Sequence, residues 1–128
     1  MLEKVEISMN IKRALLTLGA AAFLALAPAV ARADTWFECR PIQVTEASNR
    51  VDVLCTNSVL LGADTVIYLA IAKTDVAKAS RFVSMATAAV LSGQIFRGLV
   101  PTSSATNTAG CDPTNCRTPS TFGLKNGN

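Results

Sequence analysis

Apolar residues recur at helical spacing in one long segment of the chain, residues 74–93. At 3.6 residues per turn they share one arc, the kind of stripe that a helix buries against a sheet. The arc holds Val76, Ala79, Phe82, Val83, Ala86, Ala89 and Val90. Thr74 or Asp75 is suited to cap the first turn, and Gly93 is suited to the left-handed conformation that ends a helix. The pattern therefore predicts one helix, which seals a core.

Other segments have the alternating or continuous apolar patterns of strands. These segments are 36–46, 50–55, 65–73, 94–100 and 117–124. The third is almost entirely apolar, which is typical of a buried central strand, and in the last we expect Phe122 and Leu124 to point inward. The sequence therefore predicts five strands around the single helix.

Three segments lack such patterns and are expected to be irregular. Residues 56–64 predict a loop with an apolar interior. Residues 101–110 are polar and low in complexity, which predicts a flexible surface loop, and 125–128 form a loose tail.

The order strand, strand, strand, helix, strand, strand is that of the OB-fold. We therefore expect a mainly β domain over residues 34–128: a five-stranded, partly open barrel with its helix between the third and fourth strands. A sandwich would not need so apolar a helix, and a ferredoxin-like fold would need a second one.

The beginning of the chain has the pattern of a signal peptide. A short basic region at 9–13 precedes an apolar run at 14–26 and small residues at 31 and 33, which predicts cleavage before Asp34. Acidic residues ahead of this pattern indicate Met9 as an alternative start. A membrane anchor is disfavoured, because the run is about half of the ~20 residues that a span needs. We expect an exported protein, periplasmic or secreted, with no membrane span in its mature form.

The number and spacing of the cysteines indicate disulfides rather than a metal site. All four cysteines follow the predicted cleavage site, which indicates two disulfides in a short exported chain. Cys111 and Cys116 enclose a turn-forming sequence, so we pair them and leave Cys39 to Cys55. A four-cysteine zinc site lacks the usual paired spacing, so no metal is expected.

The charge of the predicted mature chain gives no indication of nucleic-acid binding. Four of the twelve basic and two of the nine acidic residues precede Asp34, so the chain from Asp34 onward is nearly neutral. A nucleic-acid-binding surface would need a cluster of basic residues.

The sequence lacks the residue types and spacings that the common catalytic sites require. The chain has no histidine, which excludes catalytic triads and histidine-ligated metals. The glycines are widely spaced and form no phosphate-binding loop. We therefore expect no enzyme activity and no cofactor.

The order of elements and cysteines resembles that of a known family. Two cysteines on the first hairpin, an apolar strand, a helix with Arg81-Phe82 and ending in Ser92-Gly93-Gln94, a further strand and the late 111–116 turn are similar to the B subunits of bacterial AB5 toxins, nearest in pattern to that of subtilase cytotoxin. The resemblance implies OB-fold pentamers whose helices line a central pore and whose outer surface binds glycans. It implies an oligomer-facing side of the helix, formed by Arg81, Met85, Ala88 and Leu91.

One departure prevents any transfer of sugar-binding residues. The toxin subunit has a longer segment before its first cysteine, whereas only residues 34–38 precede Cys39 after the predicted cleavage. The candidate ligand-binding residues therefore come from the sequence itself: Trp36, Arg40, Tyr68 and Arg97. A wider set of residues suited to recognition adds Arg50, Asp52 and the loop 102–108. Trp36 is suited to stack on a sugar ring, although a lone aromatic also packs over a barrel mouth.

Two functions fit these observations. The first is an exported, non-catalytic binding subunit that recognises a glycan or a partner protein as a homo-oligomer, a pentamer by the resemblance. The alternative is a monomeric periplasmic interaction or envelope-maintenance protein with no glycan site. The oligomeric state separates them.

Overall fold

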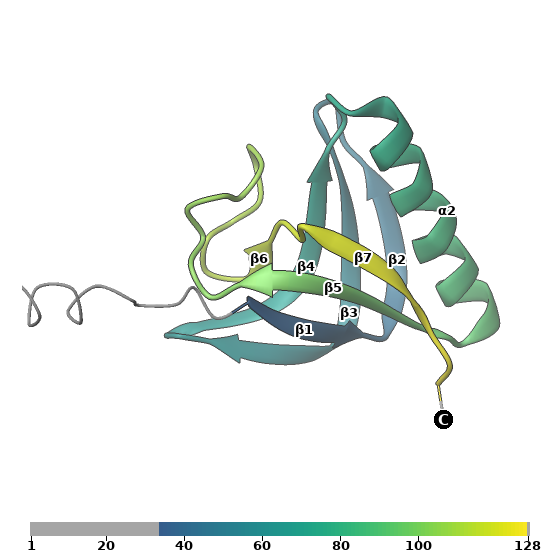
Figure 1. Ribbon diagram of the computed structural model, residues 1–128, viewed down its shortest axis with the longest axis horizontal. Helices are drawn as coiled ribbons and strands as arrows, with labels where there is room; N and C mark the ends of the chain where they lie inside the picture. Colours follow the sequence, from purple (N-terminus) through teal and green to yellow (C-terminus); the bar gives the residue numbers. More distant parts are fainter. Residues whose placement is uncertain (1–33, 128) are drawn as a thin grey trace, which may run out of the picture. The chain divides into compact units, whose positions relative to one another are not determined.

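The structure of the protein, a computed structural model, describes residues 34–127. The signal segment and cleavage site predicted within 1–33 lie outside the described residues. In the described part, four strands precede the helix and three strands follow it (Figure 1). The elements are β1 (Asp34–Cys39), β2 (Pro41–Glu46), β3 (Arg50–Leu61), β4 (Asp64–Ala72), α2 (Val76–Ser92), β5 (Ile95–Pro101), β6 (Cys116–Arg117) and β7 (Thr121–Lys125).

The strands form two sheets that share a core. One sheet has the order β1-β5-β7, and the other has the order β2-β3-β4-β6. All neighbours are antiparallel except β4 and β6, which are parallel. A mainly β domain with one helix and two disulfides is therefore confirmed. The strands pair as two separate sheets, so the five-stranded barrel of an OB-fold stays a prediction.

The helix matches its predicted boundaries. The Asp75 side chain caps the first turn by accepting a hydrogen bond from the Lys78 N–H, at 3.1 Å, and Gly93 ends the helix with a φ of 73°. Phe82 packs edge-on against Phe96 of β5 and Phe122 of β7, with ring centroids 5.1 Å apart in each pair. α2 thereby contacts both sheets.

Two residues of the predicted buried face are exposed. Val76 is 76% exposed and Val90 is also exposed, whereas Ala79, Phe82, Ala86 and Ala89 are buried. Val76, Val83 and Val90, spaced seven residues apart, run along one side of the arc, and only Val83 in the middle packs against the core, so the buried stripe is narrower than predicted. The prediction for Val76 and Val90 was wrong.

The first predicted strand, 36–46, is two strands that belong to different sheets. The chain bends at Arg40, between β1 and β2. The Asn57 side chain of β3 bridges the bend: it donates to the Glu38 carbonyl at 2.6 Å and accepts from the Arg40 N–H at 2.8 Å. Pro41 has no N–H to donate and lies beside a register shift, which is the physical reason for the break.

The loop predicted over 56–64 was wrong, because β3 continues to Leu61. A two-residue turn at 62–63 connects it to β4, with Gly62 at a φ of 63° and Leu61 paired with Asp64. The strand was missed because residues 56–58 are polar and interrupt the apolar alternation. They coincide with a register shift between Leu54 and Val59. Alternation resumes afterwards, with Leu60 exposed and Leu61 buried.

The last predicted strand, 117–124, is also two strands. β6 pairs with β4, and β7 pairs with β5. The connection packs tightly, because a Cβ added at Gly98 of β5 would lie 2.9 Å from the Pro119 Cβ. Phe122 packs against the core as expected, whereas Leu124 is exposed, so the expectation for Leu124 was wrong.

Both predicted disulfides are present. Cys39 is bonded to Cys55 and thereby joins β1 to β3, and Cys111 is bonded to Cys116 across the late turn. No helix in the part of the chain that the structure describes is long and apolar enough to cross a membrane.

Candidate functional site

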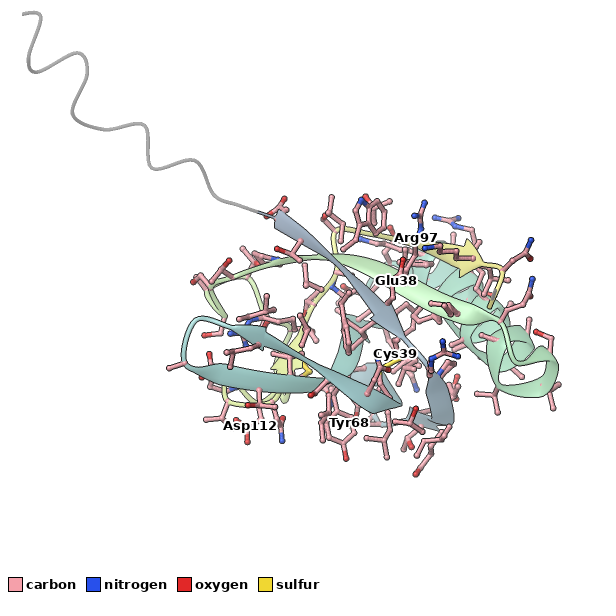
Figure 2. The ribbon with its side chains drawn as sticks, turned by 90° about the horizontal axis from the view of Figure 1, so that it is seen from below. Glu38, Cys39, Tyr68, Arg97 and Asp112 are labelled. Atoms are coloured by element: carbon pink, nitrogen blue, oxygen red, sulfur yellow. A yellow bond between two sulfur atoms is a disulfide. The ribbon has the colours of Figure 1, made fainter. Side chains whose placement is uncertain are left out.

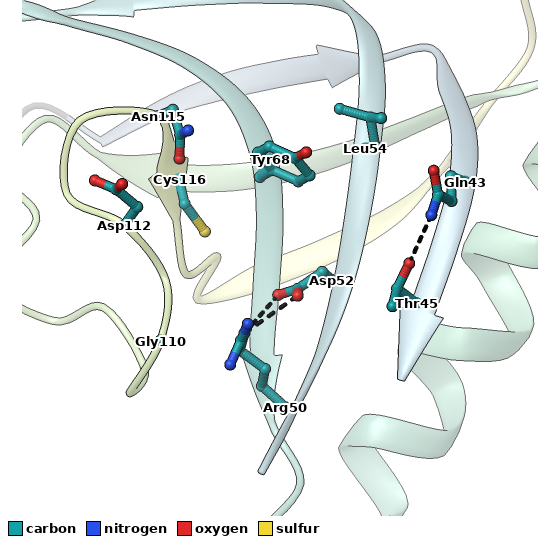
Figure 3. A pocket seen from close by; sticks show the side chains of 10 residues that line it. All are labelled: Gln43, Thr45, Arg50, Asp52, Leu54, Tyr68, Gly110, Asp112, Asn115 and Cys116. Carbon is teal, nitrogen blue, oxygen red and sulfur yellow. Dashed lines mark hydrogen bonds and ion pairs between the residues drawn. The ribbon is translucent and has the colours of Figure 1, made fainter. Parts of the chain in front are cut away.

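An open concavity of about 360 Å³ lies on the outward face of the β2-β3-β4-β6 sheet, beside the loop that leads into β6 (Figure 3). Its lining comes from all four strands of the sheet and from this loop. The lining residues are Gln43, Thr45, Arg50, Asp52, Leu54, Tyr68, Gly110, Asp112, Asn115 and Cys116.

The alternation of the strands explains the hollow. Asp52 and Arg50 of β3 are paired with Ala70 and Ala72 of β4, so bulky side chains on β3 stand beside small ones on β4. Tyr68, two residues earlier on the same face of β4, is paired with Leu54 and supplies an aromatic wall. The sheet itself therefore forms the floor of the concavity.

An ion pair forms one side of the concavity. The Arg50 Nε lies 3.0 and 3.1 Å from the two carboxylate oxygens of Asp52, and both side chains are half-buried. The backbone of Gly110 lies against the Arg50 guanidinium, so closely that an added Cβ would overlap it. Gly110 has a φ of 86°, a conformation that favours glycine. Glycine at this position therefore allows the loop to close over Arg50.

The disulfide turn forms the opposite side. The Asp112 carboxylate accepts hydrogen bonds from the Thr114 N–H at 2.9 Å and the Thr114 hydroxyl at 2.8 Å, and these bonds lower the pKa of Asp112 below its usual range. The Asn115 carbonyl accepts hydrogen bonds from the N–H groups of Ile67 and Tyr68 on β4. The turn is thereby fixed beside the Tyr68 ring.

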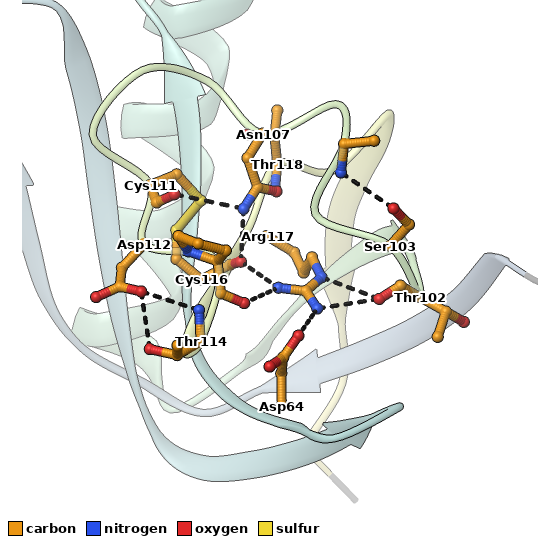
Figure 4. A network of polar contacts seen from close by, with 12 residues as sticks. Asp64, Thr102, Ser103, Asn107, Cys111, Asp112, Thr114, Cys116, Arg117 and Thr118 are labelled. Atoms are coloured by element: carbon orange, nitrogen blue, oxygen red, sulfur yellow. Dashed lines mark hydrogen bonds and ion pairs between the residues drawn. A yellow bond between two sulfur atoms is a disulfide. The ribbon is translucent and has the colours of Figure 1, made fainter.

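A buried arginine anchors this loop to the rest of the fold (Figure 4). The Arg117 guanidinium donates to the carbonyls of Thr102, Pro113 and Cys116, and to the Asp64 carboxylate at 2.6 Å. Arg117 was predicted only as the start of a strand. Its contacts show that the end of β5, the disulfide turn and the beginning of β4 are held by one side chain.

The concavity offers hydrogen-bonding groups that have no partner in residues 34–127. The Tyr68 hydroxyl and the Asn115 side-chain amide make no hydrogen bond to another described residue. The concavity also contains Asp52 and Asp112 against one cation, Arg50. The site therefore combines an aromatic ring with donors and acceptors, and it has no excess of positive charge.

The four candidate ligand residues lie in different places. Tyr68 lines the concavity. Trp36 and Arg97 come together on the other sheet, where the guanidinium carbon lies 4.4 Å from the centroid of the ring. Figure 2 shows Glu38 and Arg97 on one side of the molecule and Tyr68 and Asp112 on the other. Arg40 lies at the bend between β1 and β2, with its side chain exposed.

Several residues of the concavity were not among the candidates. They are Gln43, Thr45, Asp112 and Asn115. Arg50 and Asp52 belonged to the wider set named from the sequence; they alternate with buried valines on β3 and therefore share the outward face. Asp112 and Asn115 carry no such signal, since their place depends on how the disulfide turn packs against β4.

The four residues expected to face an oligomer differ in exposure. Leu91 is 82% exposed and Arg81 is exposed, whereas Ala88 is half-buried and Met85 packs partly against the core. Part of this side of α2 is therefore apolar and accessible.

Comparisons of the chain with protein-family models, with curated proteins and with solved structures found no match. Within residues 34–127, no group of three or more His, Cys, Asp or Glu side chains is arranged to hold a metal ion. The function is therefore inferred from the residues and their geometry.

Proposed function

We propose that the chain is an exported, non-catalytic binding protein that takes a glycan in the concavity around Tyr68. The observation that carries the proposal is the juxtaposition of the Tyr68 ring with the Arg50–Asp52 ion pair and the side chain of Asn115. Sugars present both an apolar ring face and hydroxyl groups, so an aromatic wall with donors and acceptors around it is complementary to them.

The strand pairings support an OB-type barrel as the scaffold. If β1 with β2 and β6 with β7 are each one bent strand, the chain has five strands, with α2 between the third and the fourth. The pairings β1–β5, β2–β3, β3–β4, β4–β6 and β5–β7 then link these five strands in a ring. OB-folds bind oligosaccharides and oligonucleotides on the face of their second and third strands, between the flanking loops. The concavity occupies the equivalent face on β3 and β4.

Charge favours a sugar over a nucleic acid at this face. Asp52 and Asp112 outnumber Arg50, and a phosphate backbone needs a surplus of cations. The carboxylates are instead suited to accept hydrogen bonds from sugar hydroxyls.

The test is retention of the oxidised protein on an array of immobilised neutral and acidic glycans. On a glycan that retains the parent, Tyr68→Ala should weaken binding about tenfold, because an aromatic contact contributes about 1.5 kcal/mol. Tyr68→Phe keeps the ring and should lose less. Trp36→Ala is the matched control and should bind like the parent, since Trp36 lies on the other sheet. Absence of binding to every glycan, or equal losses in Tyr68→Ala and Trp36→Ala, would contradict the proposal.

Assembly into a homo-oligomer, a pentamer as in the toxin B subunits, is the second part of the proposal. The exposed Leu91 supports it, because an accessible apolar side of a helix is a common contact surface. Native mass spectrometry of the oxidised protein tests it, with Leu91→Asp as the variant expected to shift the mass toward the monomer. A monomeric parent at every concentration would favour the alternative, a periplasmic interaction or envelope-maintenance protein.

A further inference from the structure

A second surface, separate from the concavity, gathers charged and aromatic residues on the β1-β5-β7 sheet. Trp36 and Glu38 of β1 share a face with Leu99 and Arg97 of β5, to which they are paired. Gly123 of β7 is paired with Arg97 on the same face. We call the surface formed by Trp36, Glu38, Arg97, Gly123 and Lys125 the Trp36 face.

The aromatic and guanidinium groups of the Trp36 face are held together but remain accessible. Trp36 is 42% exposed, although it is the largest side chain on the strand. The Arg97 guanidinium lies over the indole ring, 4.4 Å from its centroid, which fixes the position of both groups. Tryptophan and arginine are the residues most enriched at the energetic centres of protein interfaces.

The Arg97 guanidinium has unused hydrogen-bonding capacity. Among the described residues, it forms no ion pair and donates no hydrogen bond to another side chain or carbonyl. Its five N–H donors form a planar fork that matches a carboxylate. Because stacking on Trp36 already fixes the group, a carboxylate that binds it has a smaller entropic cost to overcome.

Of the two cations on the Trp36 face, one is paired and the other is not. Glu38 is its paired carboxylate: it lies 2.5 Å from the Lys125 Nζ. The hydrogen bond from Lys125 lowers the pKa of Glu38, with further contributions from the positive charges of Lys125, Arg97 and Arg40. Lys125 is therefore neutralised by Glu38, and Arg97 remains the cation of this face without an ion-pair partner among the described residues. A Cβ added at Gly123 would meet no atom within 4 Å, so the area beside Arg97 is open to an approaching group.

We propose that the Trp36 face is a docking surface for an acidic polypeptide segment, in which a partner's carboxylate binds the Arg97 guanidinium while its chain packs on Trp36. The unpaired guanidinium of Arg97 favours an acidic partner. The residues lie on three adjacent strands of one sheet, and such a surface suits a polypeptide that contacts several strands at once. Partner binding at this face is independent of the glycan proposed for the concavity.

The fluorescence of Trp36 provides a specific test, because it is the only tryptophan in the chain. The oxidised protein is titrated with a short oligoglutamate peptide, and Trp36 emission is recorded at low and at physiological salt. We expect a saturable change that weakens as salt rises. Oligolysine should give no change.

Matched variants identify the residues responsible. Arg97→Gln should weaken oligoglutamate binding about tenfold through the loss of a charge-assisted pair. Arg97→Lys keeps the positive charge but loses the planar guanidinium, so its affinity for oligoglutamate should lie between those of Arg97→Gln and the parent. Lys73→Gln removes one positive charge beside the other sheet, where Lys73 follows β4, and should bind like the parent. Circular dichroism verifies that each variant is folded.

Three outcomes would overturn the proposal. One is the absence of any saturable response to oligoglutamate. Another is an equal loss in Arg97→Gln and Lys73→Gln, which would indicate only general attraction by net charge. The third is a response to heparin without one to oligoglutamate, which would indicate an anionic glycan instead. Tyr68→Ala should leave the oligoglutamate response unchanged, so failure of this proposal and failure of the glycan proposal are distinguishable.

Discussion

Arg117 and Asp64, 53 residues apart in the chain, form an ion pair with 2.6 Å between Nη2 and Oδ2. The two ends of the pair differ: the Arg117 side chain is 1% exposed and that of Asp64 is 33% exposed. Arg117 also satisfies the carbonyls of Thr102, Pro113 and Cys116. Its guanidinium is therefore the centre of a polar network, and Asp64 is the partner that neutralises it.

We predict that Arg117→Met destabilises the fold by about 3–5 kcal/mol, because it leaves carbonyl groups buried without donors and Asp64 without its partner. Urea unfolding measures the change in the free energy of unfolding. Asp64→Asn is the control and should cost less, since the Arg117 guanidinium keeps its three carbonyl partners and Asn offers an oxygen. A loss in Asp64→Asn as large as that in Arg117→Met would show that charge neutralisation, rather than the carbonyl contacts, dominates.

Gly98 of β5 allows the connection between β6 and β7 to pack on the sheet. We predict that Gly98→Ala destabilises the protein by about 1–3 kcal/mol, because the new Cβ would lie 2.9 Å from the Pro119 Cβ and 3.3 Å from the Leu69 Cδ1. Gly123→Ala, on the neighbouring strand, meets no atom within 4 Å and should change stability by less than about 0.5 kcal/mol. Thermal unfolding of both variants is the measurement. Equal effects would mean that strand propensity, not the contact with Pro119, determines the cost.

Local signals in the sequence were sufficient for the helix and the disulfides. Asp75 and Gly93 are capping residues whose chemistry depends only on their neighbours. The turn-forming residues between Cys111 and Cys116 similarly indicated that pair, because they bring its two ends together without help from the rest of the chain. The strand boundaries were less predictable, because residues 56–58 are polar and yet continue β3, where Asn57 bonds to the backbone of β1 and of the bend after it. Those hydrogen bonds join residues that are 17 and 19 positions apart, so no pattern among neighbouring residues of the sequence could indicate them.

The candidate site was only partly predictable for the same reason. Tyr68 was identified from its residue type, and Trp36 and Arg97 were identified separately without any indication that they stack. The role of Arg117 was not predicted, since a lone basic residue beside a cysteine usually indicates an exposed position. Its burial depends on Asp64 and Thr102, which the fold brings together.

The Glu38–Lys125 pair makes a defined contribution to the pH dependence. The pKa of Glu38 is lowered in the folded state, first by the hydrogen bond from Lys125 and then by the nearby positive charges. The stabilisation is therefore complete above the ordinary glutamate pKa of the unfolded chain and is lost as pH falls through the lowered pKa of the folded state. NMR of the side-chain carboxyl should show this pKa rising toward the ordinary value in Lys125→Gln. Lys73→Gln, which removes a cation beside Glu46 instead, should leave it unchanged, and a Glu38 pKa insensitive to Lys125→Gln would contradict the assignment.

Gly110 connects the backbone of the loop to the proposed glycan site. In Gly110→Ala the new Cβ would overlap the Arg50 guanidinium, so Arg50 must move and its bonds to Asp52 must break. We predict a stability loss of about 1–2 kcal/mol from the left-handed backbone and, in addition, a loss of retention on any glycan that binds the parent.

Gly62→Ala separates the two effects of Gly110→Ala. Gly62 also has a positive φ, of 63°, but its added Cβ would meet only the Thr102 Cγ2, at an ordinary contact distance of 3.8 Å. The control should therefore have a similar cost in urea unfolding and no change in glycan retention, because it leaves Arg50 and Asp52 in place. If both variants retained glycans equally well, the Arg50–Asp52 pair would not belong to the binding site. If both lost retention equally, backbone strain alone would explain the loss, and the position of Arg50 would be irrelevant to binding.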